Sequence, residues 1–154
     1  MNGPGMTRRT AGRRAALFLF ALALPGAARA APALRVEVWK DPGCGCCDGW
    51  VRHMRLAGFD AVVHEVADVA PIKAARGVPK GLWSCHTALV EGYVIEGHVP
   101  ASDVRRLLAE RPRARGLSAP GMPASAPGMD IPGHPYSVVL FGAAEGGDRV
   151  FAQH

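Results

Sequence analysis

The chain has 154 residues with a formal net charge of +5, and 49% of its residues are hydrophobic. Five of its 18 basic residues, and none of its 13 acidic residues, lie in the first thirty positions, so the remainder is neutral overall. This balance argues against a nucleic-acid-binding surface built on net positive charge. The remaining residues are enough for one domain with its own hydrophobic core.

The first thirty residues have the layout of a secretory signal peptide. Basic residues up to Arg14 precede an apolar run over residues 15–24, and Ala28-Arg29-Ala30 is a small-x-small cleavage site. The apolar run is too short to span a bilayer comfortably, which favours cleavage after Ala30 over a retained anchor. The pair Arg13-Arg14 leaves twin-arginine export open beside ordinary secretion. We expect an exported protein with one mature domain, residues 31–154, and no membrane contact after cleavage.

Hydrophobic periodicity then predicts alternating strands and helices. Residues 34–39 alternate between apolar and polar, which predicts a strand, and a turn at 41–43 leads into a helix that begins around Cys44–Cys47 and stops at Gly58. We further expect a strand at 61–66, a short helix at 68–76, strands at 87–90 and 93–96 joined by a tight turn, and a helix at 100–110. This β-α-β-α-β-β-α order predicts an α/β, thioredoxin-like two-layer sandwich.

Residues 116–135 differ in composition from the rest of the chain. Five prolines and four glycines fall in this stretch, which predicts a loop without regular helix or sheet. The loop contains a short repeat, Ala-Pro-Gly-Met, which ends at Met122 and again at Met129. Strand character returns at 136–141 and 149–152 and predicts a C-terminal β-hairpin.

Three of the four cysteines lie within four residues, at the predicted start of the first helix. Cys44, Cys46 and Cys47 would there meet unpaired backbone N–H groups and the positive end of the helix dipole, which stabilise thiolates. Only a thiolate is a good metal ligand or nucleophile. The sequence therefore places reactive sulfur chemistry at the first strand-to-helix turn.

The fourth cysteine, Cys85, precedes the third predicted strand and is followed by His86. In thioredoxin-like folds the loop that enters this strand runs beside the start of the first helix, so we expect both residues to approach the cluster. Thioredoxin-like enzymes have a cis-proline in this loop, whereas Ser84–Thr87 contains no proline. Soft and borderline ligands in its place favour a metal site.

Thiolates combined with imidazole and thioether donors select soft ions, Cu(I) first and Zn(II) second. A structural zinc site usually has two separated ligand pairs, whereas three clustered thiols suit Cu(I). The two methionines of the repeat are further soft donors, with His134 nearby, unless they only attach the loop to the core. The candidate metal ligands are therefore Cys44, Cys46, Cys47, Cys85, His86, Met122 and Met129.

Two other functions remain open at this stage. Cys44 and Cys47 have the C-x-x-C spacing of thiol–disulfide oxidoreductases, so an enzyme of that class is one alternative. A zinc-stabilised structural domain is the other, because zinc also binds four cysteines. The sequence suggests no partner for His64, His98 or His154.

The residues around the cysteines resemble a known family. Residues 38–50, VWKDPGCGCCDGW, are similar to the signature of the CopG-type copper-resistance proteins, bacterial periplasmic metal-binding proteins long catalogued as a domain of unknown function. The similarity continues through residues 77–79, 84–88, 91–100, 116–117, 120–123 and 127–129, and so spans essentially all of the mature chain.

This resemblance implies a thioredoxin-like fold and copper handling in the periplasm. Cys44, Cys46 and Cys47 would be the core copper thiolates, and Cys85 with His86 would complete the site. Redox activity toward copper is compatible with the resemblance. The implied partners are copper ions and periplasmic copper-efflux or oxidase proteins.

Overall fold

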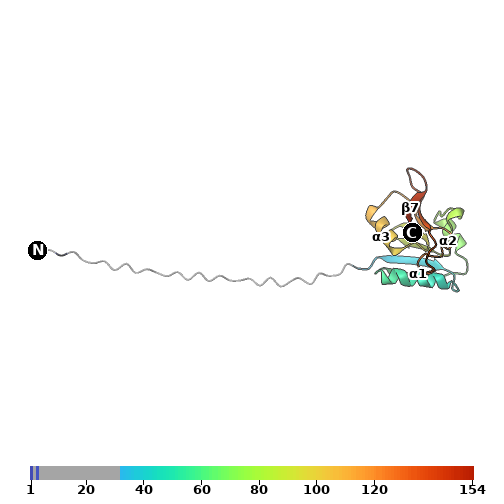
Figure 1. The fold of residues 1–154 in the computed structure, drawn as a ribbon, viewed down its shortest axis with the longest axis horizontal. Coiled ribbons are helices and arrows are strands. Elements are labelled where there is room, and N and C mark those ends of the chain that lie inside the picture. The colour runs from blue at the N-terminus through green and yellow to red at the C-terminus, as the bar shows by residue number, and fades with distance from the viewer. Residues whose placement is uncertain (2, 4–31) are drawn as a thin grey trace. The chain divides into compact units, whose positions relative to one another are not determined.

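The computed structural model describes Met1, Gly3 and residues 32–154, so the predicted signal peptide and its cleavage site lie outside the described residues. Within the described part of the chain, no helix has both the length and the apolar character needed to cross a bilayer. The elements are, in chain order, β1 (Arg35–Lys40), α1 (Gly45–Leu56), β2 (Asp60–Glu65), α2 (Ala70–Ala75), the 3-10 turn η1 (Lys80–Leu82), β3 (Thr87–Val90), β4 (Tyr93–Gly97), α3 (Ala101–Glu110), β5 (Gly116–Ala119), β6 (Ser137–Phe141) and β7 (Arg149–Gln153). Figure 1 shows the fold as a ribbon, with α1, α2, α3 and β7 labelled.

The strands form one mixed sheet in the order β2-β1-β3-β4-β5-β6-β7. β1 and β2 are parallel, as are β4 and β5, and the other neighbouring pairs are antiparallel. The carboxyl ends of β1, β4 and β5 therefore lie at the same edge of the sheet as the start of β3. This edge, called the site edge below, receives the loops that contain the cysteines.

Both faces of the sheet are covered. Alternate residues of the central strands pack with Trp50 and Met54 of α1 and with Val104 and Leu107 of α3 in the main core. Val94 and Phe141, which point the other way, form a smaller cluster with Val78. The segment that follows α2 thus covers part of the second face, a layer that the two-layer expectation did not include.

The prediction that residues 116–135 lack regular structure is wrong at its start. Gly116–Ala119 form β5, which lies between β4 and β6 with all four residues buried. A Cβ at Gly116 would lie only 1.8 Å from the carbonyl oxygen of Val94, so glycine here permits the close pairing of β5 with β4. The prolines and three of the four glycines come after Ala119, and the average over the whole stretch concealed this strand.

The predicted tight turn between β3 and β4 is confirmed. Glu91 and Gly92 both have left-handed backbone angles, φ 47° and 87°, as a two-residue hairpin with a type I′ turn requires.

The start of α3 is held by a histidine. The backbone N–H of Ala101 donates to Nε2 of His53 over 3.0 Å, which satisfies one of the unpaired donors at the helix start. Burial lowers the pKa of His53, so the imidazole stays neutral and keeps the lone pair that accepts this bond.

Candidate metal centre

The turn between β1 and α1 is fixed by local hydrogen bonds. The Asp41 side chain accepts a bond from the N–H of Gly43 over 2.7 Å, and its carbonyl accepts one from the N–H of Cys44 over 3.1 Å. The buried Lys40 ammonium donates to the same carbonyl over 3.0 Å and lies 3.1 Å from a carboxylate oxygen of Asp48 in the first turn of α1. Cys44 becomes the N-cap of α1, and the next two cysteines fall in its first turn.

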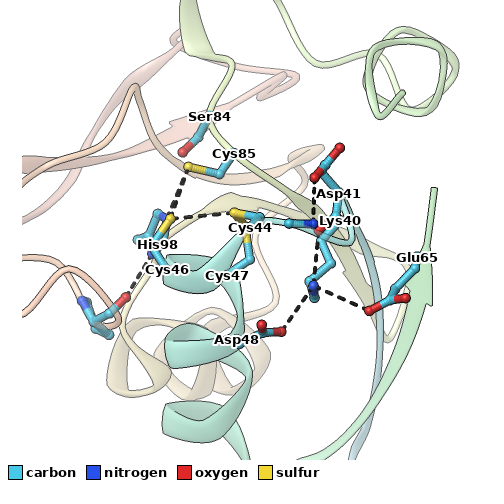
Figure 2. The surroundings of a disulfide bond; sticks show 12 residues. Lys40, Asp41, Cys44, Cys46, Cys47, Asp48, Glu65, Ser84, Cys85 and His98 are labelled. Carbon is cyan, nitrogen blue, oxygen red and sulfur yellow. Dashed lines mark hydrogen bonds and ion pairs between the residues drawn. A yellow bond between two sulfur atoms is a disulfide. The ribbon is translucent and has the colours of Figure 1, made fainter. Parts of the chain in front are cut away.

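The four cysteine sulfurs converge, as expected. All four lie within 4.8 Å of one another, although Cys85 comes from a different loop than the other three. The Cys46 sulfur lies 3.5 Å from that of Cys44 and 3.8 Å from that of Cys85. Figure 2 shows Cys85 facing the start of α1 across this gap. The main-chain topology explains the meeting, because the end of β1 and the start of β3 share the site edge.

Two of these sulfurs are oxidised in the structure. Cys44 and Cys47 form a disulfide, while Cys46 and Cys85 remain thiols. A disulfide sulfur is not a thiolate ligand, so the complete four-sulfur donor set requires two electrons and two protons to reduce this bond. The site therefore has an oxidised form with two thiols and a reduced form with four.

The Cys85 thiol resists ionisation. Burial, reinforced by the neighbouring Cys46, raises the pKa of Cys85 to about 11. In the metal-free protein this sulfur is protonated at neutral pH. An incoming cation must displace that proton, as metal binding to thiols generally does.

His98 lies beside Cys85, a contact that the sequence did not predict. Its Nδ1 is 2.8 Å from the carbonyl oxygen of Pro127, and its Nε2 is 3.4 Å from the Cys85 sulfur. Burial lowers the pKa of His98, so the ring is neutral, and because a carbonyl can only accept, the single proton lies on Nδ1. The bare lone pair of Nε2 then faces the sulfur, where it can accept the thiol proton or bind a metal ion.

The fully buried His86 lies behind this cluster. Its ring packs against Trp50 at 4.4 Å and against His98 at 5.0 Å between centroids. Neither ring nitrogen has a hydrogen-bond partner among the described residues, and the backbone of Gly97 approaches the ring without meeting hydrogen-bond geometry. Burial, with the nearby charges of Lys73 and Lys40, holds the pKa of His86 well below its usual value. The His86 imidazole therefore has nitrogen atoms free to bind a metal ion, but it is not among the side chains whose ligand atoms converge within 4.8 Å.

A buried ion pair positions the loop before β3. Glu96 accepts bonds from the Lys73 ammonium over 2.6 Å, the Ser84 N–H over 2.7 Å and the Thr87 hydroxyl over 2.7 Å. Burial raises the pKa of Glu96, and the ion pair and these bonds oppose the shift. Because Ser84 and Thr87 flank Cys85 and His86, the network fixes both ends of the segment that contains these two candidate ligands.

The chain is similar to proteins of known structure. Two solved structures, titled "Copper resistance protein copG- Form 1" and "Copper resistance protein copG- Form 2", each match with 38% identity and a TM-score of 0.73, over 79% of this chain and 98% of theirs. A family model described as "Protein of unknown function, DUF411" matches residues 82–129. The chain belongs to this DUF411 family. A search of curated proteins finds no match.

The stretch that matches the DUF411 model includes Cys85, His98 and Met122, which all lie at the site edge. His98 is a candidate site residue that the sequence did not indicate. A signal was available in the strand directions, because His98 directly follows β4, and β4 runs parallel to β1. Residues after parallel strands meet at one edge, whereas spacing along the chain gives no hint of the contact.

The two copies of the Pro-Gly-Met repeat contact different segments of the site, one the loop before β3 and the other the start of α1. Gly121 pairs with the loop before β3, where its N–H donates to the Trp83 carbonyl over 3.0 Å. Gly128 lies against the first turns of α1, so closely that a Cβ there would be 2.4 Å from the Cys46 carbonyl oxygen. The absent side chain of Gly128 therefore lets the loop approach α1, whereas a Cβ at Gly121 would meet no atom within 4 Å and that glycine is distinguished by its left-handed φ of 69°.

The methionines of the repeat and His134 have separate surroundings. Met122 is exposed and lines a pocket together with Cys85. Met129 is partly buried, and its ligand role stays a prediction. His134 lines a different pocket, with Tyr136 and His154.

Proposed function

We propose that this protein is a periplasmic copper-resistance protein that binds Cu(I) through its cysteine cluster and buffers or passes the ion. The observation that carries the proposal is the meeting of four sulfurs, within 4.8 Å of one another, from two segments of the chain. The two matched structures are of proteins named for copper resistance, which supports the choice of ion.

The chemistry of the donors supports a soft ion. Thiolate sulfur selects Cu(I) and zinc over harder cations, and neutral imidazole suits either metal. Zinc sites in proteins are mostly tetrahedral with four separate ligands. Here two ligands are consecutive residues, Cys46 and Cys47, and a disulfide links two of the four sulfurs. This arrangement suits copper better than a permanent structural zinc site.

In this proposal His98 is a fifth donor, and Cys85 and His98 act as a pair. When the ion binds the Cys85 sulfur and Nε2 of His98, the thiol proton leaves to water, because the proton on Nδ1 leaves the imidazole no second free lone pair. In the reduced form of the cluster all four cysteines are thiols, so all four sulfurs are available to bind copper. Oxidation of Cys44 and Cys47 leaves only Cys46 and Cys85, which lie 3.8 Å apart.

The direct test is copper binding by the reduced protein under anaerobic conditions, with bound metal measured by elemental analysis. The wild type is expected to hold Cu(I), and the double variant Cys46→Ser/Cys47→Ser to lose most of it. Equal copper in both proteins would show that the cluster is not the site. A parallel titration with Zn(II) separates the zinc-stabilised alternative, in which chelation should unfold the protein.

A second function has one observation in its favour. The disulfide joins Cys44 and Cys47, the pair with C-x-x-C spacing at a helix start, as in thiol–disulfide oxidoreductases. However, Cys47 is fully buried, and the Cys46 thiol lies 3.5 Å from the Cys44 sulfur, where it would compete with any external thiol. Insulin reduction by the metal-free Cys46→Ser variant would favour this function over copper binding.

We also infer a thioredoxin-like architecture for residues 35–110. Its support is the element order β1-α1-β2-α2-β3-β4-α3 and the sheet order β2-β1-β3-β4, with the cysteines between β1 and α1. Export to the periplasm rests on the signal-peptide pattern before Ala30, and mass spectrometry of the mature N-terminus in a bacterial host tests it.

A further inference from the structure

A pocket of about 290 Å³ opens beside the cysteine cluster at the site edge. Trp83, Ser84, Cys85, Gly121 and Met122 line it. Cys85 therefore borders both the pocket and the cysteine cluster, because its sulfur also lies 3.8 Å from the Cys46 sulfur. The pocket therefore leads from solvent to one of the candidate copper ligands.

The backbone on both sides of this pocket is firmly held. Gly121 forms a parallel bridge with Ser84, its carbonyl accepts a bond from the Ser84 hydroxyl, and its N–H donates to Trp83. Ser84 is in turn bonded to the buried Glu96. Gly121 has a left-handed backbone angle, φ 69°, which a side chain would disfavour and which sets the direction of the chain at Met122.

The Met122 side chain, by contrast, is 62% exposed. An exposed methionine on a rigid backbone, beside a half-buried cysteine, gains little from burial, so packing does not explain its place. A thioether is a soft ligand that suits Cu(I), and it has no proton to lose on binding. It also binds more weakly than a thiolate, so an ion held there can leave again.

We propose that Met122 and its pocket are the uptake and release site through which Cu(I) exchanges between the cluster and an external donor or acceptor. The proposal rests on the proposed function and assigns Met122 a transient role. A bond forms between the ion and the Met122 sulfur as a bond to the donor's ligand breaks. A bond to the Cys85 sulfur then replaces the bond to Met122, and the thiol proton leaves to water. Release follows the same steps in reverse.

The test compares the amount and the rate of copper uptake in the reduced full-length protein. Cu(I) held by bicinchoninate is the donor, and stopped-flow absorbance follows its loss. Met122→Leu keeps the size of the side chain and removes the sulfur, and Ile131→Leu, at another exposed position of the same loop, is the matched control. We expect Met122→Leu to bind as much copper as the wild type but about tenfold more slowly, as when one contact in the transition state is lost. Ile131→Leu should match the wild type in both.

The other outcomes separate the two proposals. Equal rates in Met122→Leu and the wild type would overturn the uptake role and leave the proposed function standing. Less bound copper at equilibrium in Met122→Leu would make Met122 a resident ligand, which also overturns the transient role. Equal slowing in Ile131→Leu would assign the effect to the loop as a whole and not to the sulfur. A wild type that takes up no copper would overturn the proposed function, and the uptake site with it.

Discussion

The Lys73–Glu96 network, which is buried, and the sulfur–histidine cluster, of which only Cys47 and the two histidines are buried, both lie at the site edge beside the segment Ser84–Thr87. In the network, the Glu96 carboxylate accepts three bonds and the Lys73 ammonium donates two. In the cluster (Cys44, Cys46, Cys47, Cys85, His86 and His98), the thiols of Cys46 and Cys85 make only long contacts, to each other, to the Cys44 sulfur and to His98, and neither His86 nitrogen has a partner among the described residues.

The two regions differ in how completely their polar groups are hydrogen-bonded, and this difference indicates a structural role for the first and a functional role for the second. Buried polar groups with complete hydrogen bonding hold a fold in place, whereas buried donors left without partners lower stability and are kept for another reason. Here the Lys73–Glu96 network positions part of the sulfur–histidine cluster, because its hydrogen bonds to Ser84 and Thr87 fix the ends of the Cys85-His86 segment. Perturbing the two regions should therefore change stability in opposite directions.

The largest expected effect is in the complete network. Glu96→Gln leaves the Lys73 charge buried without a counter-ion, so the free energy of unfolding should fall by about 3–5 kcal/mol. Urea denaturation of the metal-free protein measures it. In Lys73→Met/Glu96→Leu, which removes both charges, the loss should be smaller. A Glu96→Gln variant as stable as the wild type would show that the ion pair is unimportant.

The next effect concerns copper affinity. His98→Asn can keep the bond to the Pro127 carbonyl but has no atom at the position of Nε2, so Cu(I) affinity should fall at least about tenfold. His98→Gln, which places only a hard amide oxygen or a non-ligating amide nitrogen near the position of Nε2, should lose as much. Competition with bicinchoninate measures both affinities, and unchanged binding by His98→Asn would remove His98 from the ligand set.

In the cluster, His86→Leu should stabilise the metal-free protein. The substitution removes two buried, unpartnered nitrogens, so the free energy of unfolding should rise by about 1–3 kcal/mol. The sign is opposite to that of Glu96→Gln, which makes the pair a direct check of the comparison. A destabilised His86→Leu variant would mean that the imidazole makes bonds in the folded protein.

The smallest effect is the dependence of stability on pH. The pKa of His86 is lowered well below its ordinary value of 6.5, so below about pH 6.5 the unfolded chain binds a proton that the folded chain refuses. Stability is therefore full above that pH and falls as the pH drops, by at most about 1.4 kcal/mol per pH unit for this histidine. Denaturation of the metal-free protein between pH 7 and 5 should show a shallower fall in His86→Leu. Equal slopes would assign the effect to His53 and His98, whose pKa values are also lowered.

The sequence by itself determined the local features of this protein. Alternation of apolar residues gave the strands up to β4 and the C-terminal hairpin, and helical spacing gave α1 and α3, because each pattern reflects one buried face. The cysteines at the start of α1 could be placed because the turn and the helix around them are made by neighbouring residues.

Only the tertiary structure decided which further distant residues join the cysteines. The expected order of elements already placed Cys85, 39 residues from Cys46, near the cluster, whereas the approach of His98 and Met122 depends on the directions of β4 and β5. β5 itself is a strand because its neighbours offer backbone partners and leave room only for glycine at position 116, a condition that composition does not reveal. The physical reason is the same in each case: strand pairing acts between segments far apart in the chain, whereas periodicity reports only the surroundings of one segment.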